Sequence, residues 1–237
     1  MDSALTLLGF GDTGWGDEIA SGVWVTVTLA LATLPIGLVI GFFIALGKQA
    51  EEPTLRLAAN IYTTIFRGLP ELLTLFLVYF GAQIGVQQIA HALGFETGIE
   101  INSFVAGMFA LGVVFSSYAS EVFLSAFRAI PQGQYEGGYA VGLSYGKTMR
   151  FVVLPQLIRL ALPGLSNLWL ILLKDTALVS VVGLSDILRQ TGIAARVTKQ
   201  AFFFYGTACL LYLVLAIVSS VFIRRIELWS KKSEVVR

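Results

Sequence analysis

An arginine and a glutamate lie four residues apart where an apolar segment is interrupted. Arg67 and Glu71 flank Gly68, Leu69 and Pro70, and Glu71 opens a long apolar run. Ionisable side chains at membrane depth are costly and usually face a bundle interior or a cavity. A broken helix also leaves backbone groups free to line a binding site. We therefore predict that Glu71 presents its carboxylate to a cationic group of a substrate, in a site that its four neighbours help to form. The alternative is an Arg67–Glu71 ion pair that holds two helical turns together.

Other polar residues in the apolar segments can join this site. They are Ser117, Tyr118, Glu121, Asn167 and Asp175. Ser117 and Glu121 lie one turn apart and share a helix face. Lys174 and Asp175 are adjacent, so they point in different directions and are expected to have separate partners. For each residue the competing interpretation is a hydrogen bond between helices, and Glu121 can instead pair with Arg128 or with a neighbouring subunit.

A polar, glycine-rich and basic stretch, Tyr135–Pro155, separates two apolar segments. A small membrane protein has little soluble surface, so such a loop is where a soluble partner is expected to dock. Its residues from Gly142 to Thr148 invite comparison with a phosphate-binding loop. That motif needs four residues between its first glycine and Gly-Lys-Ser/Thr, whereas three intervene here. We therefore predict that this stretch is not a phosphate-binding loop and that this chain does not itself hydrolyse ATP.

Histidine and cysteine are too scarce for most catalytic or metal sites. His91 is the single histidine, and Cys209 is the single cysteine and lies in an apolar run. A histidine dyad or cluster within the chain is excluded, and no disulfide framework or zinc pattern is present. No set of serine, histidine or cysteine suggests a hydrolase. We expect a transporter subunit and not an enzyme, with no metal and no cofactor bound by this chain.

The composition is that of an integral membrane protein. Of the 237 residues, 56% are hydrophobic and 13% are charged, about half the charged fraction of a soluble domain. A membrane-spanning helix needs about 20 apolar residues. The runs that meet this need predict about five transmembrane helices: Ile19–Gly47, Leu72–Ala90 with a start as early as Asn60, Ile101–Ser120, Leu160–Ser185 interrupted at Lys174-Asp175, and Ala201–Ile223. These runs are continuous and do not alternate, so the fold is all-α and not a β-barrel.

Basic residues indicate the orientation of the chain. Lys and Arg follow the first span, lie between the third and fourth, and follow the fifth, whereas the opposite side has none before Arg189. Because basic residues mark the cytoplasmic side, we predict an N-terminus outside, a C-terminus in the cytoplasm and a cytoplasmic Tyr135–Pro155 loop. Arg189, Arg196 and Lys199 break the pattern, so their connection is expected to return partly into the protein.

Two pairs of glycines predict close helix packing. Gly37 and Gly41 form one pair, and Gly81 and Gly85 form the other. Small residues four apart allow two helix backbones to approach closely in a membrane.

The polar loop resembles the "EAA" loop of ABC-importer permeases. That family pattern is Glu-Ala-Ala, three residues, Gly, nine residues, Ile, any residue, Leu-Pro. Here Val152 replaces the isoleucine, and glycines 137 and 138 replace the two alanines. The resemblance assigns contact with an ATPase to Glu136, Gly137, Gly138, Ala140, Gly142, Leu154 and Pro155.

The glycines of this loop suggest how it folds. Gly142 can take the backbone torsions of a tight turn between two short helices. An interior helical glycine costs about 1 kcal/mol relative to alanine. The double glycine at 137 and 138 therefore predicts a helix that is weak in isolation and is ordered by docking.

Two further stretches extend the resemblance to nearly the whole chain. Tyr62–Gly81 fits the polar amino-acid ABC-importer permeases, and Lys174–Ser180 is close to their "LKDTSLVS" signature. The chain is most similar to the Q-type subunits of histidine/lysine/arginine/ornithine permeases, in which an acidic residue stands where Glu71 stands here. The resemblance implies a type I ABC-importer permease fold, one permease domain over residues 1–237 with a coupling loop at about 129–156, and a basic amino acid or opine as substrate.

The resemblance also implies partners. A second permease subunit, by this likeness a paralogous M-type chain, completes the translocation path in the bacterial inner membrane. An ATPase dimer holds ATP and Mg, and a periplasmic amino-acid-binding protein delivers the substrate. No nucleic acid is expected as a partner. The main alternative is an ATP-independent secondary transporter or channel, and a membrane enzyme is a second one. Which basic amino acid or opine is carried stays open.

Overall fold

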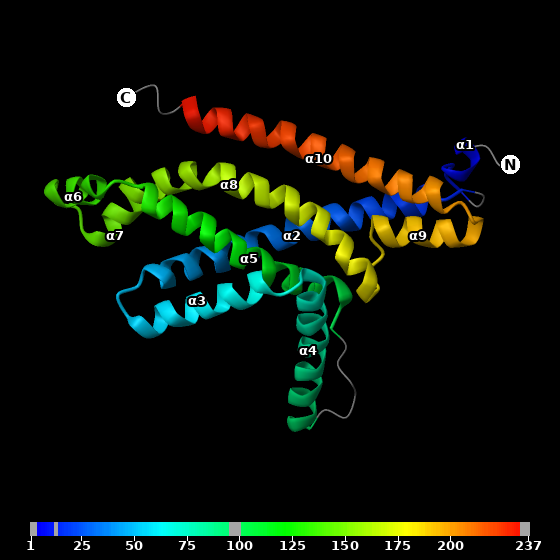
Figure 1. Ribbon diagram of the computed structural model, residues 1–237, viewed down its shortest axis with the longest axis horizontal. Helices are drawn as coiled ribbons and strands as arrows, with labels where there is room; N and C mark the ends of the chain where they lie inside the picture. The colour runs from blue at the N-terminus through cyan, green and yellow to red at the C-terminus, as the bar shows by residue number, and fades with distance from the viewer. Residues whose placement is uncertain (1–3, 12–13, 95–100, 233–237) are drawn as a thin grey trace.

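The computed structural model describes residues 4–11, 14–94 and 101–232, and every regular element in these ranges is helical. The elements are α1 (Ala4–Leu7), α2 (Gly16–Gln49), α3 (Pro53–Gly68), α4 (Glu71–Ala92), α5 (Ser103–Ala129), α6 (Gln132–Ala140), α7 (Tyr145–Thr148), the π-helix η1 (Met149–Val153), α8 (Leu154–Asp175), the 3₁₀-helix η2 (Thr176–Val182), α9 (Ile187–Thr198) and α10 (Ala201–Lys232). The predicted all-α fold is confirmed (Figure 1).

Five helical stretches are long and apolar enough to cross a membrane, in agreement with the predicted number. They are Gly16–Gln49, Glu71–Ala92, Ser103–Ala129, Tyr145–Val182 and Ala201–Trp229. The proposed early start of the second span near Asn60 is wrong, since Asn60 belongs to the separate helix α3. Pro70 separates the two helices: Leu69 before it is extended, with φ −90° and ψ 147°, as the proline ring requires of its predecessor.

Small residues bring α2 and α5 together at the centre of the bundle. A Cβ added at Gly37 would lie 2.4 Å from Phe115 Cδ1, and one added at Gly41 would lie 2.9 Å from Ala119 Cβ. Both distances are too short for real side chains. The predicted close approach at this first glycine pair is therefore present, and it places the inner face of α5 in the core.

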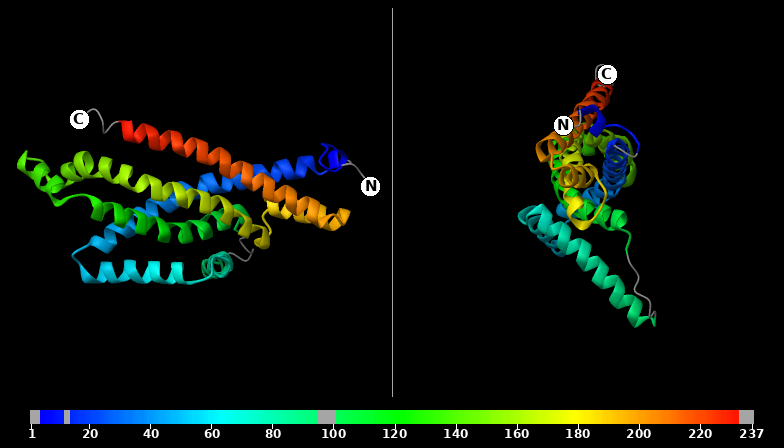
Figure 2. Two further views of the ribbon diagram at one scale, coloured as in Figure 1. Left: turned by 45° about the horizontal axis from the view of Figure 1, so that its top comes forward. Right: turned by 90° about the vertical axis from the view of Figure 1, so that its right-hand side faces the viewer.

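Helix α4 projects from the bundle at a steep angle (Figures 1 and 2). It packs against α5 and η2. The Tyr79 hydroxyl lies 3.0 Å from Ser103 Oγ at the start of α5. Added Cβ atoms at Gly81 and Gly85 meet no heavy atom within 4 Å among the described residues. The close packing predicted for this second pair is therefore not made within the described part of the chain.

A π-helix joins the polar loop to α8. The Leu154 amide donates to the Met149 carbonyl, five residues earlier. Pro155 explains the wider turn, since its ring lacks an N–H and crowds the carbonyl four residues before it. Such insertions in α-helices are commonly single turns. Helix α8 then runs without interruption to Asp175, where the predicted interruption takes the form of the change to the 3₁₀ turn η2.

The connection after η2 folds back onto the bundle, as its basic residues led us to expect. Helix α9 packs against α2 and α10. Its N-cap is the fully buried Asp186, whose Oδ1 accepts a 3.0 Å hydrogen bond from the Arg189 amide. The Thr26 hydroxyl on α2 accepts one of 3.3 Å from the Ile187 amide. The Tyr212 hydroxyl of α10 lies 3.4 Å from Asp186 Oδ2. This buried polar cluster fixes α9 between two spans.

Candidate functional site

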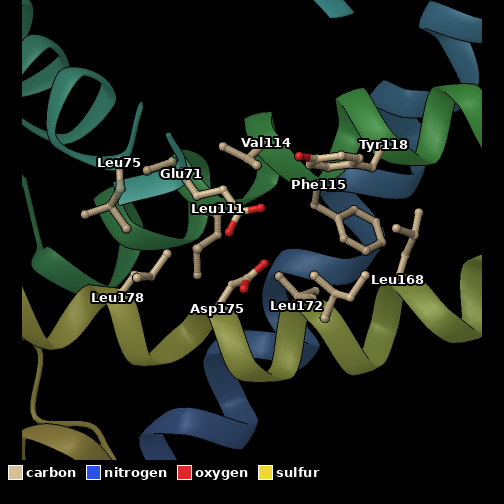
Figure 3. Close-up of a pocket in the computed structure, with 12 residues that line it drawn as sticks. Glu71, Leu75, Leu111, Val114, Phe115, Tyr118, Leu168, Leu172, Asp175 and Leu178 are labelled. Atoms are coloured by element: carbon tan, nitrogen blue, oxygen red, sulfur yellow. The ribbon is translucent and has the colours of Figure 1, made fainter. Parts of the chain in front are cut away.

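Two carboxylates face each other in a small pocket where α4, α5, α8 and η2 meet. Glu71 and Asp175 point toward one another across it, and Tyr118 lies at its other end (Figure 3). The remaining lining is apolar and consists of Leu75, Ala110, Leu111, Val114, Phe115, Leu168, Ile171, Leu172 and Leu178. The pocket brings together three of the residues that the sequence nominated, from segments far apart in the chain.

Helix boundaries position both carboxylates. Pro70 is the N-cap of α4, so Glu71 is the first residue of that helix, where the helix dipole favours a negative charge. Asp175 is the last residue of α8. The apolar wall was missed by the sequence reasoning. Its signal was the helical spacing of Leu111, Val114 and Tyr118, which places them on one face of α5.

The chemistry of the pocket favours a cation. Carboxylates in an apolar setting are costly unless a positive charge offsets them. The volume of the pocket is about 20 Å³, enough for roughly one water molecule. A group the size of an ammonium ion therefore fits between Glu71 and Asp175, and a whole amino acid requires the surrounding helices to separate.

Three charged residues, Lys48, Arg67 and Glu121, form a cluster beside Tyr118, and their ion pairs differ from those expected from the sequence. Arg67 Nη1 lies 3.0 Å from Glu121 Oε1, and Lys48 Nζ donates to the same carboxylate oxygen. The alternative Arg67–Glu71 pair is thus replaced by Arg67–Glu121, because the break at Pro70 turns Glu71 away from the helix that carries Arg67. Among the described residues, Glu121 pairs with Lys48 of α2 and Arg67 of α3 and not with Arg128.

The cluster keeps one positive charge beyond the single carboxylate. The Lys48 side chain is 5% exposed, whereas that of Arg67 is 44% exposed. The Arg67 guanidinium lies 5.7 Å from the ring centroid of Tyr118, within the range of a cation–π contact. Tyr118 therefore lies between the two carboxylates on one side and an accessible arginine on the other.

The other nominated residues do not line the pocket. Ser117 is fully buried and donates to the Val114 carbonyl at 2.7 Å, within its own helix. Asn167 is exposed on α8. Gly68 is the last residue of α3 and Leu69 follows it in the link to α4. A Cβ added at Gly68 meets no heavy atom within 4 Å among the described residues. The side chains of these residues therefore do not contribute to the lining of the pocket.

The Tyr135–Pro155 stretch forms two short helices joined by a tight turn. Gly142 has φ +82°. The Gly142 amide donates to the Tyr139 carbonyl at 2.9 Å, and the Leu143 amide donates to the Gly138 carbonyl at 3.0 Å. This pair of bonds is the Schellman motif, which commonly places glycine in the left-handed conformation after a helix. The predicted role of Gly142 as a turn residue is confirmed.

The two adjacent glycines of α6 have different surroundings. Gly137 is exposed, and a Cβ added there meets no heavy atom of the described residues within 4 Å. Gly138 is buried, and its added Cβ would lie 2.5 Å from Thr148 Cγ2. Gly138 therefore lets α6 pack directly on α7, and only Gly137 is free of a packing requirement.

The outer surface of these two helices is polar and aromatic. Glu136 and Ala140 are exposed, as are Tyr139, Tyr145 and Phe151, which are 46, 66 and 62% exposed. Leu154 is partly buried and Pro155 is exposed at the start of α8. Exposed aromatic side chains are enriched at protein-binding surfaces.

Comparison with known proteins gives consistent results. The family model described as "Binding-protein-dependent transport system inner membrane component" matches residues 37–229. The nopaline transport system permease protein of Agrobacterium fabrum is 43% identical over 229 residues, covering 96% of this chain and 97% of that protein. The histidine/lysine/arginine/ornithine transport system permease protein of Salmonella typhimurium is 37% identical over 207 residues, covering 87% and 90%.

A solved structure shares the fold. It is described as a crystal structure of an amino acid ABC transporter with histidines. The two chains superpose with a TM-score of 0.75 at 31% identity, over 90% of this chain and 94% of the other.

Proposed function

Because the chain belongs to the family of binding-protein-dependent transport system inner membrane components, we propose that it moves basic amino acids or opines across the membrane as a permease subunit of an ABC importer. Its relatives are named as permeases for nopaline and for histidine, lysine, arginine and ornithine. The observation that carries the proposal is the pair of carboxylates, Glu71 and Asp175, that face each other inside an otherwise apolar pocket. A cationic side chain between them contacts both carboxylates and offsets one of the two negative charges.

We propose further that Arg67 receives the carboxylate of the same substrate. An amino acid or opine carries at least one carboxylate as well as its cationic groups. Arg67 is partly exposed, and among the described residues its one acidic partner, Glu121, is shared with Lys48. Arginine suits this role because its planar guanidinium can bind a carboxylate through two parallel hydrogen bonds. A substrate extended past Tyr118 would then have its negative end at Arg67 and its positive end at Glu71 and Asp175.

The proposal assigns α6 and α7 to docking on an ATPase. Their exposed carboxylate, Glu136, and their aromatic surface support this role. The turn at Gly142 and the packing of Gly138 on Thr148 give the two helices a defined shape. We expect Glu136→Arg to uncouple ATP hydrolysis from transport. Unchanged ATP-driven uptake together with unchanged ATPase association would contradict this assignment.

The rest of the assembly follows from the family and is proposed in the same terms. We propose one permease domain over residues 1–237, a paralogous second permease subunit, an ATPase dimer that holds ATP and Mg, and a periplasmic binding protein. The five apolar helices support a multi-pass protein of the bacterial inner membrane. The distribution of basic residues supports an N-terminus outside and a cytoplasmic C-terminus.

The test is uptake by the reconstituted transporter. The full complex is placed in proteoliposomes with its binding protein, and uptake of radiolabelled arginine is measured with and without internal ATP. Uptake without ATP would instead favour a secondary transporter. Glu71→Gln and Asp175→Asn each remove one charge-assisted contact worth about 1.5–3 kcal/mol, so arginine uptake should fall about tenfold or more at limiting substrate.

A matched control separates this loss from a general change of charge. Glu18→Gln removes a carboxylate from the first turn of α2, on an exposed position far along the chain from the pocket, and should leave uptake unchanged. Complex assembly is checked by co-purification of the ATPase. If Glu71→Gln and Asp175→Asn both assemble and transport arginine at the wild-type rate, the pocket is not the cation site.

A further inference from the structure

An apolar groove runs between α2, α8 and α10, apart from the carboxylate pocket. Its volume is about 420 Å³, within the range of about 300–1,000 Å³ typical of ligand pockets. It is lined by Leu31, Leu34, Leu38, Leu162, Leu165, Ser166, Trp169, Val218, Ser219, Phe222, Ile223 and Ile226. The two serines are the only polar residues of this lining. An occupant must therefore be apolar along most of its length.

The three helices place one defined end of the groove next to basic side chains. Helix α8 runs antiparallel to α10 and to α2 (Figure 1). Arg159 precedes Leu162, the first lining residue of α8, by three residues and therefore lies about one turn before it. Arg225 follows Phe222 by three residues and adjoins Ile226, the last lining residue of α10. Because the helices are antiparallel, these two arginines lie at the same end.

Both arginines are available to a ligand. Both are exposed, and among the described residues neither forms an ion pair. The nearest acidic residue in the sequence of α10 is Glu227, two positions beyond Arg225 and therefore about 200° further round the helix. The groove end thus keeps a positive charge.

An aromatic residue marks the depth of this end. Trp229 follows Arg225 by one turn on α10 and is 76% exposed. Exposed tryptophans on spanning helices concentrate at the level of the lipid head groups. The two arginines and the mouth of the groove therefore lie where a phosphate group of a membrane lipid would lie, with the apolar lining extending toward the hydrocarbon core.

We propose that this groove binds an anionic phospholipid, with an acyl chain between α2, α8 and α10 and the head-group phosphate at Arg159 and Arg225. The apolar lining accounts for the acyl chain, and the unpaired arginines account for the negative head group. A zwitterionic lipid fits the lining equally well but leaves the positive charge of the mouth uncompensated. The preference for an anionic head group is therefore the distinctive consequence.

The test counts lipids that stay bound to the purified transporter. The complete complex is equilibrated in bilayers of equal parts phosphatidylglycerol and phosphatidylcholine, extracted with detergent, and examined by native mass spectrometry. The wild type should retain phosphatidylglycerol in excess over phosphatidylcholine. Each arginine near an anionic lipid surface contributes enough for about a fivefold change in binding, so Arg159→Gln and Arg225→Gln should each lower the preference about fivefold and the double variant about 25-fold.

Two further variants make the result specific to the groove. Arg224→Gln removes the same charge from the same turn of α10, but two positions from Phe222 and hence on the opposite face, and should keep the wild-type preference. Ser166→Phe fills the lining without altering the charges and should lower retention of both lipids.

The inference is overturned if the Arg159→Gln/Arg225→Gln double variant keeps the preference, if Arg224→Gln loses as much of it, or if the wild type retains no lipid. Equal retention of the two lipids by the wild type would also overturn it, since the arginines would then select nothing. Ser219→Phe serves as a second variant that fills the groove. If neither Ser166→Phe nor Ser219→Phe lowers lipid retention, the lipid binds outside the groove.

Discussion

Replacing each glycine of the Gly137–Gly138 pair by alanine tests how the α6–α7 unit is built. Alanine at either position raises the intrinsic helix propensity of α6. The two positions differ in what the added methyl group meets. At Gly137 it meets no atom within 4 Å in the part of the chain that the structure describes, whereas at Gly138 it lies 2.5 Å from Thr148 Cγ2 and 2.8 Å from Thr148 Oγ1. Gly137→Ala should therefore stabilise α6, and Gly138→Ala should not.

The expected magnitudes follow from these contacts. Gly137→Ala gains up to about 1 kcal/mol of helix stability. Gly138→Ala gains the same propensity but overpacks a site where Thr148 is 1% exposed, which typically costs about 1–3 kcal/mol. The two variants should thus differ by about 1–3 kcal/mol in the local opening free energy, or roughly five- to 150-fold in the opening equilibrium.

Hydrogen exchange of the α6 amides measures this difference in local opening free energy, because exchange in a short surface helix reports local opening and not global unfolding. The measurement is made on the purified transporter, with ATP-driven uptake measured alongside. Thr148→Ala provides the matched control, since it removes both of the clashing atoms. The Gly138→Ala/Thr148→Ala double variant should recover much of the protection that Gly138→Ala loses.

Equal hydrogen-exchange protection of the α6 amides in Gly137→Ala and Gly138→Ala would refute the reasoning. It would mean that the Thr148 side chain moves away from the added methyl group without a loss of stability. Failure of Thr148→Ala to rescue Gly138→Ala would show that the loss arises elsewhere. Fast exchange of the wild-type α6 amides in the permease without its ATPase, together with slow exchange in the complete complex, would favour the earlier expectation that docking on the ATPase orders α6.

Three more changes test the packing, the charge cluster and the buried acid. Gly37→Ala should lower the free energy of unfolding by about 1–3 kcal/mol, because its Cβ would meet the Phe115 ring at 2.4 Å; thermal unfolding of the purified protein measures this, and an unchanged midpoint would contradict it. Lys48→Met should cost about 1.5–3 kcal/mol by removing a charge-assisted hydrogen bond to Glu121, and a fully stable variant would show that Arg67 alone suffices. Burial raises the pKa of Asp186 from 3.8 to about 6. The folded state then holds a proton that the unfolded state releases, so wild-type stability relative to Asp186→Asn should fall as the pH rises from about 4 through 6. A pH-independent difference would disprove that shift.

The spans and their breaks were predictable because they depend on local sequence. Apolar runs longer than 20 residues define the membrane helices, and Pro70 ends α3 through its own ring geometry. The turn at Gly142 was predictable for the same reason, since few other residues take a positive φ readily. These features need only their near neighbours in the chain.

The partners of the charged residues were not predictable from spacing. The expectation of an Arg67–Glu71 pair assumes one continuous helix, and the break that was itself predicted removes that geometry. Glu121 finds Lys48, 73 residues away, and such a contact depends on how α2 crosses α5. The facing of Glu71 and Asp175 likewise requires the positions of two helices relative to a third. Sequence reasoning nominated both carboxylates for the site, but only the tertiary structure brings them to one pocket.

Helix α8 connects the helices proposed to dock on the ATPase, α6 and α7, to the carboxylate pocket as one continuous helix. Its first residue, Leu154, adjoins the α6–α7 unit, and its last, Asp175, lines the pocket. The 22 residues of α8 span about 33 Å at 1.5 Å per residue. An axial displacement of its first turn is therefore delivered at Asp175, while Glu71 is carried by a different helix. The distance between the carboxylates of Glu71 and Asp175 therefore changes when α8 moves along its axis. On the proposed function, a force applied to α6 and α7 therefore changes the affinity of the pocket for a cation, and by reciprocity a cation bound between the carboxylates resists that displacement.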